Sequence, residues 1–138
     1  IEPAEGQFSQ AALDHYSRMI DAVLARGLKP AVTYSHFTTP RWFASRGGFE
    51  VPDGADLFAR YADRLTRTLG DRIGLALTFN EPQVAGQLRW IPSLKPLFAI
   101  ADKMFAAAAK ASGSDCFAVT NLGDPARFEA IMMDAHVK

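Results

Sequence analysis

A carboxylic acid directly follows an apolar run near the middle of the chain, in the tripeptide Asn80-Glu81-Pro82. The run before it, residues 73–79, is apolar almost throughout, which is typical of a parallel strand buried on both faces. Pro82 favours extended backbone at Glu81, and a carboxyl group held at a strand end is well placed to protonate the departing oxygen of a glycosidic bond. Asn80 is a candidate ligand for a sugar hydroxyl. The tripeptide is equally typical of a strand-end turn, and spacing alone does not decide between the two.

Cleavage of a glycosidic bond requires a second carboxyl group, which attacks the sugar carbon in retaining enzymes. Glu50 is the one other acid expected on the same face of the molecule, although a solvated loop acid is the simpler interpretation of it. His36 follows the run 30–35 as Asn80 follows its own strand. It is a candidate ligand for sugar hydroxyls, and a structural histidine is the alternative.

Three aromatic residues on the expected loops are Trp42, Phe43 and Trp90. Aromatic faces suit the apolar faces of sugar rings, so these residues are candidates for a wall on which a sugar stacks. The alternative is that they form small packing clusters.

Composition restricts the class of protein. The chain has 138 residues, of which 49% are hydrophobic, and its 15 basic residues balance 15 acidic ones. No basic stripe or apolar run of membrane length is present, so we expect no nucleic-acid partner and no membrane partner. Cys116 is the only cysteine and no Cys/His group has zinc spacing, so we expect no metal and no cofactor. No signal peptide is visible at Ile1, which favours a cytoplasmic location and leaves secretion open.

Apolar residues at helical spacing predict four helices. Capping residues or glycines lie at their ends. The first three helices span about residues 9–27, 53–70 and 94–112, and the fourth begins at Asp124. Pro125 suits the first turn of the last helix. In the third helix we expect an inward apolar side formed by Leu97, Ile100, Ala101, Met104, Phe105 and Ala108.

Two runs predict strands, at 30–35 and 73–79, and residues 117–120 fit either a short strand or an extended connection. The connections 36–52 and 80–93 contain prolines or glycines and are expected to be irregular loops. Strands that alternate with helices indicate βαβ units, a parallel sheet and an α/β fold class. In such folds the loops after the strand carboxyl ends carry the functional side chains.

The order of several motifs resembles glycoside hydrolase family 1, whose members include bacterial β-glucosidases. The resemblance covers about residues 1–90 and weakens beyond Arg89. The segments that carry it are Ile1-Glu2-Pro3-Ala4-Glu5-Gly6, Ala12-Leu13-Asp14-His15-Tyr16, Gly27-Leu28-Lys29-Pro30, Val32-Thr33-Tyr34-Ser35-His36-Phe37, Pro40-Arg41-Trp42-Phe43, Gly47-Gly48-Phe49-Glu50, Phe58-Ala59-Arg60-Tyr61-Ala62 and Thr78-Phe79-Asn80-Glu81-Pro82.

The resemblance implies that Glu81 is the general acid/base, that Asn80 contacts the sugar 2-hydroxyl and that His36 binds the glycone hydroxyls. Phe37 falls where many members have tryptophan, so it keeps a packing role in substrate binding and loses the hydrogen bond. We include Trp42 among the expected substrate-binding residues. Gln83, and Thr38-Thr39 before the proline, also depart from the family pattern and leave the aglycone preference open.

The largest departure is the family's nucleophile, a glutamate in a Thr-Glu-Asn-Gly-like run that does not occur here. A whole (β/α)8 barrel takes about 250 residues. The resemblance therefore implies one domain over residues 1–138 that forms part of a TIM barrel, its third and fourth βα units. It implies retaining hydrolysis of β-glucosides or related oligosaccharides, with a nucleophile from outside this sequence. The alternatives are a sugar-binding module without turnover and a purely structural fragment.

A strip of parallel strands exposes two edges and the apolar face that the barrel interior would cover. We therefore expect copies of the chain to associate, or a complementing barrel fragment to cover the strip.

Overall fold

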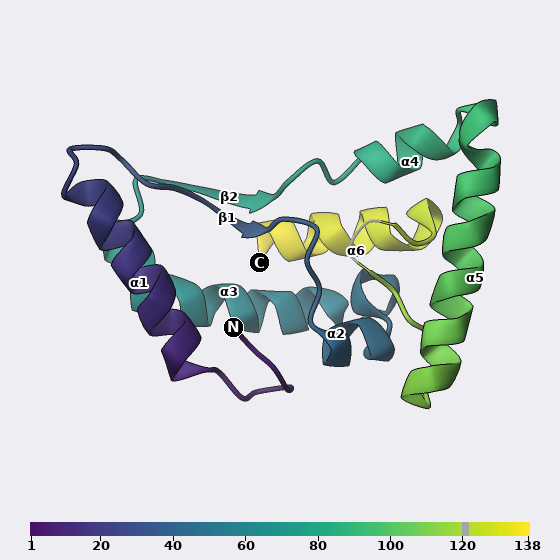
Figure 1. The fold of residues 1–138 in the computed structure, drawn as a ribbon, viewed down its shortest axis with the longest axis horizontal. Coiled ribbons are helices and arrows are strands. Elements are labelled where there is room, and N and C mark those ends of the chain that lie inside the picture. Colours follow the sequence, from purple (N-terminus) through teal and green to yellow (C-terminus); the bar gives the residue numbers. More distant parts are fainter. Residues whose placement is uncertain (120–121) are drawn as a thin grey trace.

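The structure is a computed structural model of the chain, and it describes residues 1–119 and 122–138 apart from the side chain of Ala85. Its strands lie between α1 at one end of the molecule and α5 at the other (Figure 1). With η for a 3-10 helix, the elements are α1 (Gln10–Leu24), β1 (Ala31–Ser35), α2 (Arg41–Arg46), η1 (Gly48–Glu50), α3 (Gly54–Leu69), η2 (Gly70–Arg72), β2 (Leu75–Phe79), α4 (Val84–Arg89), η3 (Pro92–Leu94), α5 (Lys95–Ser112) and α6 (Pro125–Val137).

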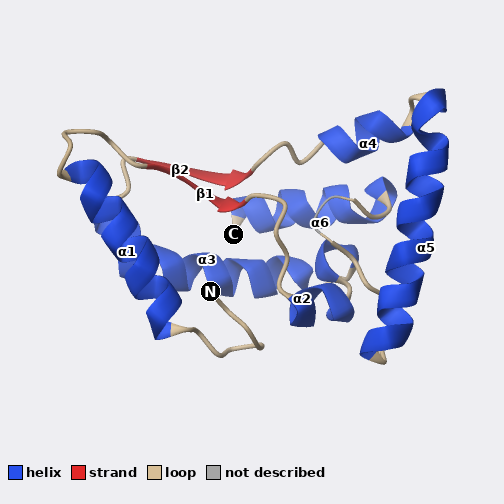
Figure 2. Ribbon diagram, in the orientation of Figure 1, coloured by secondary structure: helices blue, strands red, loops and turns tan. Residues whose placement is uncertain are grey.

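The two predicted strands form a parallel sheet in the described part of the chain, which confirms the α/β class (Figure 2). Ala31 lies opposite Leu75, and Ser35 lies opposite Phe79. β2 begins two residues later than the sequence predicts. The amide N–H groups of Gly74 and Leu75 both donate to the carbonyl of Pro30, at 2.9 and 3.1 Å, so the chain turns into the ladder at this point.

The four predicted helices are present as α1, α3, α5 and α6. Ser9 caps α1, where its hydroxyl accepts from the Ala12 amide at 3.2 Å, and Asp124 caps α6 by accepting from the Ala126 amide at 3.1 Å. Asp53 precedes α3 without a side-chain capping bond. Its carboxylate pairs instead with the guanidinium of Arg46.

Two connections predicted to be irregular contain short helices, and the prediction was wrong for them. The 36–52 connection contains α2 and η1, and the 80–93 connection contains α4 and η3. Pro40 and Gly47 mark the two ends of α2, and Gly47 takes the left-handed conformation (φ 110°) that ends a helix. These breakers bound a short helix and do not exclude one. Residues 117–119 have no regular structure, and Thr120 lies outside the described residues.

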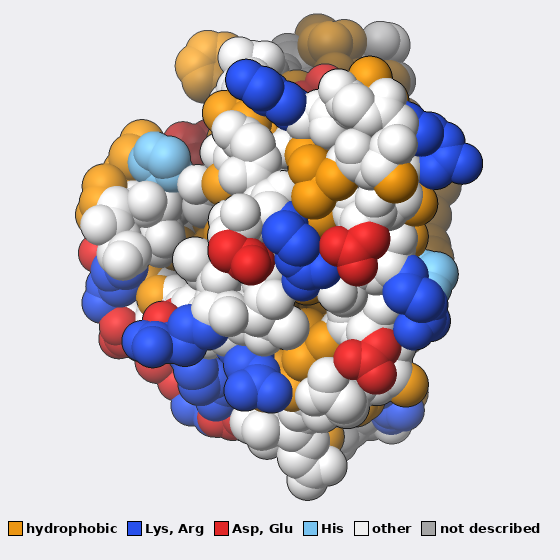
Figure 3. Space-filling view, turned by 90° about the vertical axis from the view of Figure 1, so that its left-hand side faces the viewer, with side chains coloured by type: hydrophobic (Ala, Val, Ile, Leu, Met, Phe, Trp, Pro, Cys, Tyr) orange, Lys and Arg blue, Asp and Glu red, His pale blue; other side chains and the backbone are white. Residues whose placement is uncertain are grey.

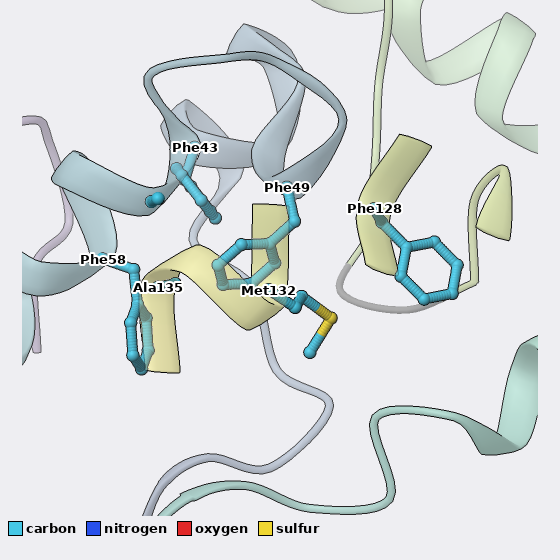
Figure 4. Packing of buried hydrophobic residues seen from close by; sticks show 7 residues of the cluster. Phe43, Phe49, Phe58, Phe128, Met132 and Ala135 are labelled. Atoms are coloured by element: carbon cyan, nitrogen blue, oxygen red, sulfur yellow. The ribbon is translucent and has the colours of Figure 1, made fainter. Parts of the chain in front are cut away.

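The core lies between the sheet and the helices α2, α3 and α6 (Figure 4). Aromatic rings meet edge-on or stacked, as between Phe58 and Phe79 at 4.8 Å and between Phe43 and Phe49 at 5.1 Å. α6 supplies Phe128, which is 0% exposed. The buried members of the cluster are Phe43, Phe49, Ala55, Phe58, Phe128, Met132 and Ala135.

α6 is the helix after β2 that packs in the core beside the sheet. It also contacts α3 and η1. The connection from β2 to α6 therefore includes an arm, α4 to α5, at the end of the molecule toward which the strands point (Figure 2). Arg89 holds this arm together. Its guanidinium lies 4.5 Å from the ring centre of Phe98, pairs with Asp102 at 3.1 Å and donates to the carbonyl of Leu122 at 2.9 Å.

Of the six apolar residues of α5 predicted to face inward, three are exposed, and Ala101, Phe105 and Ala108 are half-buried. Leu97, Ile100 and Met104 are 60%, 57% and 65% exposed, and α5 instead buries Phe98 and Ala109. The prediction was wrong for these three residues because α5 belongs to the arm, and none of its residues is a member of the main core cluster. No helix in the described residues is long and apolar enough to cross a membrane. On the face at the α1 end, acidic and basic side chains are interspersed (Figure 3).

Two neighbouring methionines on α6 give a matched test of this core. Met132 is 3% exposed and Met133 is 65% exposed. We expect Met132→Ala to lower the free energy of unfolding by about 2–5 kcal/mol, because it leaves a cavity among aromatic rings. Met133→Ala should change it by less than about 0.5 kcal/mol. Urea unfolding of both variants measures the difference, and equal losses would contradict the packing of α6.

Candidate active site

Two predicted site residues directly follow the two strands. His36 comes after the last residue of β1, and Asn80 comes after the last residue of β2. Since Ser35 lies opposite Phe79 in a parallel ladder, both strands end at the same edge. The amide of Asn80 donates to the carbonyl of Ser35 at 2.9 Å and extends the pairing by one step. The sheet therefore brings the backbones at His36 and Asn80 together at its carboxyl edge.

The next residue on each loop has an unusual backbone. Phe37 has φ 63° and Glu81 has φ 46°, and among the described non-glycine residues these are the two with positive φ. The expectation that Pro82 keeps Glu81 extended was therefore wrong. The left-handed conformation costs a non-glycine residue about 1–2 kcal/mol. Strain of this kind persists where the surroundings enforce it and is often found at functional sites.

The side chains at this edge are open to solvent. His36, Phe37 and Glu81 are exposed, and Asn80 is half-buried. The rings of His36 and Phe37 contact each other edge-on, with centres 5.2 Å apart and planes at 85°. The edge thus presents an imidazole, an aromatic ring, an amide and a carboxylate, a set that can bind sugar hydroxyls and transfer a proton.

The three aromatic residues considered for a sugar-stacking wall do not form one. Phe43 is 7% exposed and belongs to the core, whereas Trp90 is 86% exposed at the end of α4. Trp42 is half-buried, and its indole N–H donates to the carbonyl of Glu2 at 2.9 Å. The expectation of a common wall was wrong because α2, which the sequence did not reveal, turns Phe43 into the core.

Glu50 has a structural position. One of its carboxylate oxygens accepts from the Asp124 amide at 3.1 Å. A methyl group on Gly123 would lie only 1.6 Å from the same oxygen, so a larger residue there would displace the Glu50 carboxylate. Glu50 lies in η1, is half-buried, and contacts the residue that caps α6 through this solvent-exposed hydrogen bond. Burial raises the pKa of the nearby Cys116 thiol, and the charge of Glu50 adds to that effect.

A cavity of about 540 Å³ lies beside β1, and no pattern in the sequence predicts it. Tyr34 and Ser35 of β1 line it, together with aromatic side chains from the helices such as Tyr16, Trp42 and Tyr61. Burial, with smaller effects of Tyr16, Glu2 and Tyr34, raises the pKa of Tyr61 to about 12. The cavity is therefore a mainly apolar space next to the carboxyl end of β1. The described residues contain no group of three His, Cys, Asp or Glu side chains that could hold a metal.

The chain is similar in sequence and in structure to known β-glucosidases. The model of glycosyl hydrolase family 1 matches residues 2–122. The thermostable β-glucosidase B of Thermobispora bispora is 39% identical over 88 residues, which are 64% of this chain and 19% of that protein. The chain therefore spans about a fifth of this relative's length.

Two solved structures show the same arrangement to different extents. The apo structure of a β-glucosidase 1317 superposes with a TM-score of 0.95 at 45% identity, over 99% of this chain and 34% of that one. The β-glucosidase from Thermotoga maritima in complex with deoxynojirimycin gives a TM-score of 0.57 at 38% identity, over 60% of this chain and 19% of that one. The full chain, arm included, is thus similar to about a third of a longer β-glucosidase.

The backbone at Glu81 can be tested apart from any activity. Glu81→Gly and Glu81→Ala both remove the carboxylate, but only glycine adopts positive φ without a steric cost. We expect the glycine variant to be more stable than the alanine variant by about 1 kcal/mol in urea unfolding. At the exposed helical position Asp63, the order should reverse by about 1 kcal/mol. Alanine being the more stable residue at both positions would contradict a left-handed Glu81.

Proposed function

The chain belongs to glycosyl hydrolase family 1, and on that premise we propose that it carries the acid/base half of the active site of a retaining β-glucosidase-like enzyme. One observation carries the proposal. The parallel ladder joins Ser35 to Asn80, so the loops that hold His36 and Glu81 start side by side. The β-glucosidases to which the chain is similar support the substrate class, a β-glucoside or a related oligosaccharide.

In the proposed reaction, the Glu81 carboxyl protonates the glycosidic oxygen as the bond to the sugar breaks. A second carboxylate attacks the sugar carbon from the other side and forms a covalent intermediate. Glu81, now ionised, takes a proton from the water that releases the sugar. Asn80 donates to the 2-hydroxyl, and His36 with Phe37 holds the glycone. Glu81 is exposed in this chain, so the dry surroundings of a working acid come from outside it, as does the nucleophile.

We propose that the chain forms the third and fourth βα units of a TIM barrel. β1 with α3 is the first of the two units, and β2 with α6 is the second. Both helices pack on the same aromatic core, which includes side chains from β1 and β2. Parallel strands with outer helices support this assignment, and the arm between β2 and α6 is then an insertion at the catalytic end.

The open sides of the sheet support a complementing partner. Leu75 and Leu77 of β2 are 59% and 41% exposed, and the cavity borders β1. A neighbouring barrel strand placed along β1 would fill the cavity with apolar side chains and pair with the edge of the sheet. A second copy of the chain is the alternative occupant of these surfaces.

A second candidate function is sugar binding without turnover. The exposure of His36, Phe37 and Glu81 favours it for the chain alone, because a sugar can reach these groups while retention still requires another carboxylate. Saturable binding of glucose or deoxynojirimycin with no product from a β-glucoside would support this alternative. A fragment with a structural role only predicts neither binding nor any sugar-dependent change in stability.

The role of Glu81 is tested on the chain together with the complementing partner that supplies the nucleophile, with two aryl β-glucosides that differ in the basicity of their leaving groups. Glu81→Gln should lower the rate by about 10²–10⁴-fold for the leaving group that needs protonation, and by less for the one that does not. Glu129→Gln, at an exposed position on α6, is the matched control and should leave both rates unchanged. Equal rates for Glu81→Gln and the unsubstituted chain would remove Glu81 from the mechanism.

Association of the chain is tested by light scattering at micromolar concentration. We expect particles larger than a monomer, since apolar strand surface is exposed to solvent. Leu75→Lys places a charge on this surface and should shift the chain toward the monomer. Leu28→Lys adds the same charge at a residue that is 60% exposed between α1 and β1, and it should not. A clean monomer of the unsubstituted chain would contradict the proposed partner surface.

A further inference from the structure

We infer that Glu2 and Trp42 are positioning residues that fix the turn carrying His36 and Phe37. The inference rests on the proposed function, in which His36 and Phe37 of that turn bind the glycone. The Glu2 side chain is 1% exposed, and Glu2 is the one charged residue that is buried in the described part of the chain. Burying a carboxylate is costly unless it is paired and hydrogen-bonded. The partners of Glu2, on the N-terminal segment, α2 and α3, show which elements this buried residue joins.

The carboxylate of Glu2 has two partners, and both contact the same oxygen. One oxygen accepts from the amide of Gly6 at 2.6 Å and is ion-paired with the guanidinium of Arg60 on α3. Arg60 also lies 3.8 Å from Glu5, and Glu5 pairs with Arg46 of α2 at 2.7 Å. The N-terminal segment is thereby held against α3 through a buried charge and against α2 through an exposed one.

Glu2 also holds α2 through its main chain. Its carbonyl accepts the indole N–H of Trp42 at 2.9 Å. The guanidinium of Arg60 lies 5.6 Å from the centre of the Trp42 ring, within the range of a cation–π contact. Glu2, Trp42 and Arg60 thus form a closed set of contacts between the N-terminal segment, α2 and α3, which we call the Glu2 clamp.

The Glu2 clamp lies at one end of the turn that carries two site residues. The turn, residues 36–40, joins β1 to α2, and Trp42 is the second residue of that helix. The bond from Asn80 to Ser35 fixes the other end of the turn. Within it, the amide of Thr38 donates to the carbonyl of His36 at 2.8 Å, and Phe37 takes its positive φ. A turn this short, fixed at both ends, has little freedom, so the position of α2 determines where His36 and Phe37 lie.

A substitution that removes one hydrogen bond distinguishes an effect on the position of the turn from an effect on the stability of the whole chain. Trp42→Phe keeps an aromatic ring for packing and for Arg60, and it removes the indole N–H that binds Glu2. Trp90→Phe makes the same chemical change at a residue that is 86% exposed on the arm, and it is the matched control. If Trp42→Phe does not fold, Glu2→Gln is the second variant, because it keeps an acceptor oxygen and removes the charge that pairs with Arg60.

The experiment is NMR spectroscopy of the whole isotope-labelled chain. Positive φ brings the Phe37 amide proton close to its own α proton, and the resulting strong cross-peak reports the turn directly. We expect Trp42→Phe to weaken this cross-peak and to shift the His36 ring signals, while Trp90→Phe leaves both unchanged. Glu2→Gln should shift the same signals. An unchanged turn in Trp42→Phe, or in Glu2→Gln if only that variant folds, would overturn the inference, and so would equal shifts in Trp90→Phe.

A glucose titration on the same samples distinguishes this inference from the proposed function. If the turn binds the glycone, Trp42→Phe should weaken glucose binding by about fivefold, the factor for about one lost hydrogen bond. Unweakened binding with a displaced turn would overturn the positioning role. If the unsubstituted chain binds no glucose, the proposed sugar site fails, and the Phe37 and His36 signals still decide whether the Glu2 clamp fixes the turn.

Discussion

The ladder between β1 and β2 places Ser35 opposite Phe79, and the amide of Asn80 donates to Ser35 just beyond it. Every candidate site residue depends on this register. A slip of one strand by one residue would turn that strand's side chains to the other face, and His36 and Asn80 would no longer start their loops at the same level of the sheet. The same register puts Phe37 and Glu81 at equal distances along their chains from the strand ends, and both take positive φ there. The sheet thus determines the site through its backbone, before any side chain contributes.

The helices determine which side of this sheet is stable and which is open. α3 and α6 pack on the aromatic core that Tyr34 and Phe79 join, and the N-terminal segment is tied to α2 and α3. Elsewhere, apolar residues of β2 and of the arm remain exposed. Superposition on about a third of a longer β-glucosidase accounts for this asymmetry, because the chain has the shape of one sector of a larger fold.

Local patterns in the sequence predicted the elements whose boundaries are set by local chemistry. Ser9 and Asp124 cap helices with their own side chains, and the runs before His36 and Asn80 pair in parallel. Short helices such as α2 escaped prediction because the six residues of α2 make fewer than two turns, too few to show a helical period. The outward side of α5 and the burial of Glu2 escaped it because both depend on which elements meet in space. The left-handed backbone of Glu81 reversed a local preference, as tertiary structure does at strained sites.

The central claim is that Glu81 is one member of a carboxylate pair whose other member this sequence does not supply. The most direct measurement is the distance from the Glu81 carboxyl to the nearest second carboxyl in a crystal structure of the chain bound to its complementing partner. A pair separated by about 5–5.5 Å is expected for a retaining enzyme. A separation of about 6.5–9.5 Å would contradict retention, and the absence of any second carboxyl across a sugar-sized space would contradict the catalytic role of Glu81.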